Sequence, residues 1–176
     1  TTYEGRAGAS HTLISGAAQI TGVGTITQDT VTFTSANSTD PLIEIKNTTS
    51  DTNGARLRFS KDKGSAGADG DIIGNIEFIG DDAGQTQTTF AKIVAQVSEA
   101  DNTDEAGKLS LLVAESDGTT TQLTAGLVLE GEHATDGEVD VTIGAGASST
   151  VTIPGSIDLA GDIDVDGTLE TDALTI

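Results

Sequence analysis

The fold class of this chain is decided by residues 71–97, which read DIIGNIEFIGDDAGQTQTTFAKIVAQV. Apolar and polar residues alternate in both halves of this stretch, and such alternation is typical of half-buried strands. Gly74 interrupts the first half and is expected at a bulge or a close approach. The polar, Gly-containing run GDDAGQTQ at 80–87 separates the two halves, so the stretch predicts a β-hairpin.

One face of the second strand is expected to be buried. That face carries Ala91, Ile93, Ala95 and Val97. The opposite face carries a charged and an amide side chain among its apolar ones and is the poorer candidate for a core.

The same alternation continues along most of the chain, and no stretch shows the 3.6-residue period of a helix. Further strands are expected at 31–33, 42–46, 55–59 and 108–116, whereas 60–71 holds only small and charged residues and predicts an exposed loop. The sequence therefore predicts an all-β fold of short antiparallel strands.

The composition limits how large a core one copy of the chain can build. Leu, Ile, Val and Phe together make 41 of the 176 residues, Gly makes 22, and Cys, Met and Trp are absent. This apolar content lies just above the level at which acidic chains stay disordered. Without Cys, neither a disulfide nor a thiolate metal site is possible.

The charge balance excludes two classes of partner. Eight basic residues face 28 acidic ones, which gives a net charge of −20. Such a chain repels nucleic-acid phosphates and anionic membrane surfaces. We therefore expect no nucleic-acid binding, and because no run approaches the roughly 20 apolar residues that cross a bilayer, no membrane insertion.

Three tandem hexads occupy residues 155–172 and read GSIDLA, GDIDVD and GTLETD. A six-residue strand-and-turn unit cannot bury its apolar side alone and must stack on neighbouring units or on other chains. Sharing an axial core lets a chain with few large side chains bury enough surface. We therefore predict an elongated, intertwined homotrimer with a C-terminal β-helical or β-prism-like shaft. Its candidate core residues are Ile157, Leu159, Ile163, Val165 and Leu169.

Composition also divides the chain into three parts. No Lys or Arg occurs after Lys108, and the strands are expected to become shorter beyond Gly131. The predicted domains are a Gly- and Thr-rich segment at 1–40, a β-rich module at 41–130 and an acidic hexad shaft at 131–176.

An ordered set of features in residues 55–113 resembles a module of bacteriophage tail fibres, tailspikes and related virion appendages. The features are a strand with an aromatic residue near its end, a small-residue loop, a GD-x-x-G-x-I-x-F-x-G-x-D strand and turn, an aromatic-Ala-basic-Ile strand, and an acidic loop that closes on Gly107. The resemblance covers about a third of the chain. It implies a trimeric, β-rich shaft or adaptor that links the virion to a receptor-binding tip.

Four basic residues near the start of this module, Arg56, Arg58, Lys61 and Lys63, form one cluster. On a chain of net charge −20, the partner that suits this cluster is the acidic surface of a neighbouring protomer or of another virion protein. The cluster is therefore a candidate inter-chain or virion docking site.

No stretch predicts catalysis or a cofactor. The run DIDVDG at 162–167 opens like a calcium loop, but Ala173 stands where the bidentate Glu belongs, so we expect a solvated acidic strand face rather than a metal site. His11 and His133 lie far apart in sequence and are expected to be solvated. The aromatic residues are too few and scattered to line a sugar-binding cleft.

The expected function is that of a structural virion fibre segment. It would connect the phage particle to a host-recognition element, support host attachment, and act on the virion outside the cell. Its expected partners are two further copies, other virion structural proteins and, through another segment, a host surface receptor. The alternatives are a receptor-binding or capsid-decorating protein and a glycan-depolymerising tailspike.

Overall fold

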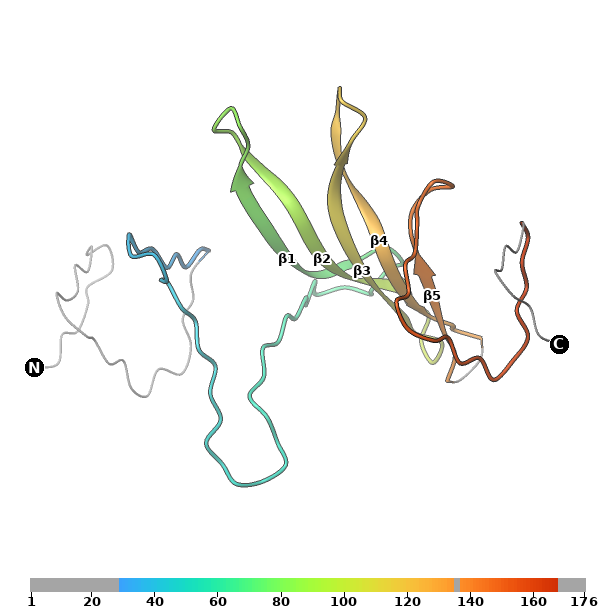
Figure 1. Cartoon of the computed structure of the whole chain (residues 1–176). Coiled ribbons are helices and arrows are strands. Elements are labelled where there is room, and N and C mark those ends of the chain that lie inside the picture. The colour runs from blue at the N-terminus through green and yellow to red at the C-terminus, as the bar shows by residue number, and fades with distance from the viewer. Residues whose placement is uncertain (1–28, 135–136, 168–176) are drawn as a thin grey trace, which may run out of the picture. The chain divides into compact units, whose positions relative to one another are not determined.

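The computed structural model describes residues 29–134 and 137–167. Within these ranges the chain forms five strands and no helix, so the prediction of an all-β fold is confirmed (Figure 1). The strands are β1 (Ile72–Asp81), β2 (Gln87–Glu99), β3 (Ala106–Ser116), β4 (Thr121–Gly131) and β5 (Val139–Ile143).

The strands make one open antiparallel sheet in the order β1-β2-β3-β4-β5, so each strand pairs with its neighbours in the chain (Figure 1). Short polar loops make this meander possible, because antiparallel strands need only a few residues to reverse direction. The hairpin predicted at 71–97 is confirmed as β1 and β2.

Local side-chain hydrogen bonds explain why the chain turns where it does. In the β1–β2 turn, an Asp82 carboxylate oxygen accepts hydrogen bonds from the backbone N–H groups of Gly84 and Thr86, at 2.8 and 2.9 Å. In the β3–β4 turn, Asp117 accepts from the N–H groups of Thr120 and Thr119, and these bonds lower the pKa of its carboxyl. Both are Asx-type turns, which Asp favours.

The chain divides into two units between Arg56 and Leu57, and the whole sheet lies in the second. The sheet continues past Gly131 into β5, which pairs with β4. The predicted domains 1–40, 41–130 and 131–176 stay predictions.

Several predicted strands are not strands in this structure. Residues 31–33, 42–46 and 55–59 are extended but unpaired, and Leu42 and Ile43 are 79% and 64% exposed. This corrects the sequence prediction, and the reason is physical: a strand needs a neighbour for its backbone hydrogen bonds.

The hexads behave in the same way. Residues 155–167 form no strand, and four of the candidate core residues, Ile157, Leu159, Ile163 and Val165, are 42–68% exposed. Leu169 lies outside the described residues.

The described part of the chain has no interior. Not one side chain in residues 29–134 and 137–167 is buried, whether apolar or polar. The face of β2 with Ala91, Ile93, Ala95 and Val97 is half-buried in the single chain, so its full burial stays a prediction. The described residues form no second layer to cover the sheet, and folded domains normally consist of at least two packed layers.

Candidate inter-chain surface

The register of the sheet gathers apolar side chains on one face. Residues paired across an antiparallel sheet share a face, and every second residue along a strand returns to it. Ile93 pairs with Ile76 and Leu111, and Leu111 pairs with Leu127, which pairs with Ile143. This row is apolar across all five strands.

The rows on either side have the same character, and together they make a surface that we call the apolar face. Its members are Ile76, Phe78, Ala91, Ile93, Ala95, Val97, Leu109, Leu111, Val113, Leu127, Leu129, Val139, Val141 and Ile143. Glycines and Thr124 occupy the other paired positions of these rows, so no charged side chain lies among them.

The apolar face is open to solvent in the single chain. Along β3, Leu109, Leu111 and Val113 are 37, 38 and 55% exposed, whereas Ser110 and Leu112 on the opposite face are half-buried. On β5 all residues are exposed. On β3 the apolar face is thus the more exposed one, which is the reverse of the pattern in a soluble monomer, whereas on β2 and β4 residues of both faces are half-buried.

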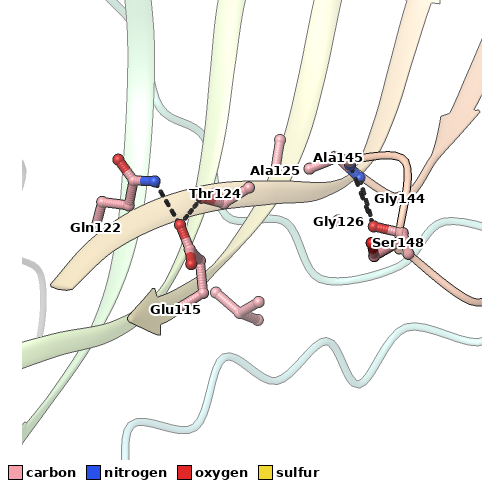
Figure 2. A pocket seen from close by; sticks show the side chains of 11 residues that line it. Glu115, Gln122, Thr124, Ala125, Gly126, Gly144, Ala145 and Ser148 are labelled. Atoms are coloured by element: carbon pink, nitrogen blue, oxygen red, sulfur yellow. Dashed lines mark hydrogen bonds between the residues drawn. The ribbon is translucent and has the colours of Figure 1, made fainter. Parts of the chain in front are cut away.

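Polar groups bound the apolar face near the β3–β4 turn. A pocket of about 550 Å³ lies there, between these strands and the turn at 144–149 (Figure 2). Glu115 accepts hydrogen bonds from Gln122 Nε2 and Thr124 Oγ1, and Ser149 Oγ accepts from two backbone N–H groups of that turn. These hydrogen-bonded polar groups form a polar rim beside the apolar face.

The opposite face of the sheet mixes apolar side chains such as Val94, Leu112 and Val128 with polar ones, and we call it the polar face because two cross-strand ion pairs lie on it. Lys92 Nζ lies 2.9 Å from Glu77 Oε1, and Lys108 Nζ lies 2.9 Å from Glu130 Oε1; both pairs join directly opposed residues. Glu130 also accepts from the Ser98 hydroxyl, and this bond together with Lys108 lowers the pKa of Glu130. Opposed charges of this kind favour one register over a shifted one.

Phe59 packs against β1 on the side of the apolar face. A Cβ atom built on Gly74 would lie only 2.8 Å from the Phe59 Cβ. Gly74 pairs with Ala95, a member of the apolar face, so only glycine leaves room for Phe59 at this position. The predicted close approach at Gly74 is confirmed.

The predicted basic cluster is only partly free. Lys63 and Lys61 both contact the carboxylate of Asp71, at 2.7 and 3.2 Å, and the Ala68 N–H donates to the same group. These contacts, led by the hydrogen bond from Lys63, lower the pKa of Asp71 to about 2.

Arg56 and Arg58 are exposed, and neither forms an ion pair with any residue of the described ranges. Arg56 belongs to the first compact unit and Arg58 to the second. The available positive charge of the cluster is therefore smaller than the sequence suggests.

The loops at the other end of the sheet meet through His133, which follows β4. His133 Nδ1 lies 3.3 Å from Asp104 Oδ2, and this contact raises the pKa of His133. Both side chains are about half exposed. The expectation of a merely solvated histidine missed this pair, which the sequence separation of 29 residues conceals. His11 lies outside the described residues.

In residues 29–134 and 137–167, no group of three or more His, Cys, Asp or Glu side chains is placed to hold a metal ion. No helix in these ranges is long and apolar enough to span a bilayer.

Comparison of the chain with protein-family models, curated protein sequences and solved structures found no significant match.

Proposed function

We propose that this chain is a structural segment of a bacteriophage tail fibre or related virion appendage and that it functions as a homotrimer. One observation carries the proposal: a chain with a regular five-stranded sheet has no buried side chain in its described residues. Hydrophobic burial is the main favourable contribution to folding, so a surface of this kind requires other chains to cover it. The features of residues 55–113 supply the phage-appendage context.

The proposed role is mechanical. In the assembled form, copies of the chain would intertwine along a common axis, and the hexads would continue this axis as a narrow shaft around Ile157, Leu159, Ile163, Val165 and Leu169. Gly155, Gly161 and Gly167 recur every six residues and allow a turn after each short strand. Such a rod would hold a host-recognition element at a distance from the particle.

The charge of the chain suits this role. With a net charge of −20, neighbouring fibres repel one another and stay soluble. Arg56 and Arg58 are the members of the basic cluster left for contact with acidic surfaces of other virion proteins. We propose no catalytic step and no cofactor, because the polar groups lining the pocket beside β3 and β4 are hydrogen-bonded to one another.

The proposal is tested on the purified chain by sedimentation equilibrium and by thermal unfolding at several protein concentrations. We expect a particle of three times the chain mass of 17.7 kDa. Its midpoint of unfolding should rise with concentration, because association stabilises only the assembled state. A monomer with a cooperative unfolding transition that does not depend on concentration contradicts the proposal.

A further inference from the structure

We infer that the apolar face of the sheet is the surface through which copies of this chain associate, with the polar face turned to solvent. This inference rests on the proposed homotrimer and deepens it: the main inter-chain contact lies on β1–β5 rather than only on the C-terminal hexads. In the trimer, the apolar face of each copy meets the same faces of the two other copies around the shared axis.

The exposure of β3 and the placement of the ion pairs distinguish the two faces of the sheet. Leu109, Leu111 and Val113 are more exposed than the residues between them, while the charged pairs Glu77–Lys92 and Lys108–Glu130 lie on the opposite face. A sheet with one apolar and one ion-paired face belongs in a layered structure, with the apolar side inward.

The area of the apolar face is large enough for a protein interface. Five strands about 4.8 Å apart and four side-chain rows about 6.8 Å apart give a face of roughly 600 Å². A stable protein interface buries about 600–1,000 Å² on each partner. The apolar face alone therefore reaches the lower end of that range.

Charge identifies the occupant as another copy. A chain of net charge −20 is repelled by its own copies wherever acidic residues meet. The rows of the apolar face carry no charged side chain, so they offer like-charged copies a surface of contact without that repulsion. A basic foreign partner would gain more from the acidic surface than from this face.

The edges of the sheet make strand-to-strand joining a poorer route. β5 has five residues, and the β1–β2 pairing is interrupted by register shifts at Ile72/Gly74 and at Phe78/Ile79. Short edge strands and bulges are the features that prevent a sheet from adding further strands. Face-to-face packing is left as the route that buries the apolar side chains.

The test uses cysteines placed on the two faces, because the natural chain has none. Leu111→Cys lies at the centre of the apolar face, and the matched control Ser110→Cys is its neighbour on the polar face. The full-length variants are assembled, checked by sedimentation and treated with a short bis-maleimide cross-linker. We expect Leu111→Cys to give covalently linked chains on a denaturing gel, with at least ten times the yield of Ser110→Cys.

The outcomes separate this inference from the proposed function. If the particle is trimeric but Ser110→Cys cross-links as well as or better than Leu111→Cys, the inference fails and the homotrimer stands. If both variants and the natural chain sediment as monomers, the proposed function fails and the inference fails with it. Since Leu→Cys keeps a small apolar side chain, the variant is a mild change.

A mixed experiment identifies the occupant. Leu111→Cys is co-assembled with Leu159→Cys, whose substitution lies in the first hexad. We expect products linked through the same position in both chains, 111 to 111 and 159 to 159, to dominate over the product between positions 111 and 159. A dominant product between the two different variants overturns the inference, because it places the hexad segment on the apolar face.

Discussion

The sheet at Ile72–Ile143 and the hexads at 155–167 share the same apolar alternation, yet only the sheet pairs its strands within one chain. The difference lies in the connections. Asp82 and Asp117 fix tight turns that bring β2 beside β1 and β4 beside β3, whereas each hexad begins with a glycine and holds only a short apolar run. A strand pattern becomes a paired strand only where a neighbour is within reach.

The sheet and the hexads also share one property, the exposure of their apolar side chains. In both, the apolar side chains remain exposed in the single chain: Val141 is 57% exposed and Ile163 is 68% exposed. Pairing of strands within one chain thus satisfies the backbone hydrogen bonds of the sheet but leaves its apolar side chains exposed to solvent. Under the proposed function, the apolar side chains of both regions become buried only when copies of the chain associate.

The largest effect is expected from Val141→Asp on β5. Val141 lies on the apolar face and Thr142→Asp, the matched control, lies on the opposite face of the same strand; both residues are exposed in the single chain. An Asp enclosed between copies should destabilise the assembly by about 2–4 kcal/mol per chain, while the control should change it by less than about 0.5 kcal/mol. Chemical denaturation measures both, and equal effects would show that β5 is not covered.

Gly74→Ala probes the close approach of Phe59 within the sheet region. The new Cβ would lie 2.8 Å from the Phe59 Cβ, so the backbone near either residue must move. We expect a loss of about 1–3 kcal/mol by overpacking. Gly126→Ala is the control, because a Cβ at that position meets nothing within 4 Å. Unchanged thermal stability of Gly74→Ala would show that Phe59 does not pack there.

Ile163→Asp probes the hexads. We expect a loss of about 1–2 kcal/mol, smaller than for the sheet, because each hexad buries few side chains. The strand signal of the sheet in circular dichroism should persist while protease cleavage near the C-terminal end becomes faster. Asp164→Asn, the next residue in the same hexad, is the control and should leave the cleavage rate unchanged. Equal protease resistance of Ile163→Asp would count against a packed hexad shaft.

The ion pair between Glu77 and Lys92 tests how far polar-face contacts hold the register. A double-mutant cycle with Glu77→Gln and Lys92→Met should give a coupling energy of about 0.2–1 kcal/mol, because both side chains are partly exposed. The coupling should shrink when salt is added. A coupling energy of zero at low salt would show that this ion pair does not stabilise the strand register.

The smallest effect is expected from His133. Its pKa is raised by Asp104, so the contact contributes stability below the pKa of the unfolded state, and that contribution disappears as the pH rises through the folded-state pKa. NMR titration of the His133 ring should show a lower pKa in the Asp104→Asn variant. An identical titration in both proteins would mean that the two loops do not meet in solution.

The sequence revealed the β1–β2 hairpin because its two alternating runs flank a strong turn signal. It did not reveal β4, and the reason is the register shift between Leu111 and Leu112. The shift moves Leu123 and Leu127 to opposite faces, so the regular alternation that would mark the strand is broken. β5 was missed as a member of the sheet because pairing with β4 depends on the loop between them.

The candidate site was predicted unevenly for a similar reason. The grouping of Ala91, Ile93, Ala95 and Val97 on one face follows from the two-residue period of any strand. Leu111, Leu127 and Ile143 lie on the same face as these residues, and that placement depends on which residues pair across the sheet. Likewise, the engagement of Lys61 and Lys63 by Asp71 depends on a loop that folds back on itself.

The sequence by itself determined that this chain forms strands, is strongly acidic and lacks the side chains for a large core of its own, because those properties follow from composition and local period. The tertiary structure alone decided which strands pair, which face is apolar and which cations are already neutralised. Those outcomes arise from contacts between residues distant in sequence, whose pairing no local pattern encodes.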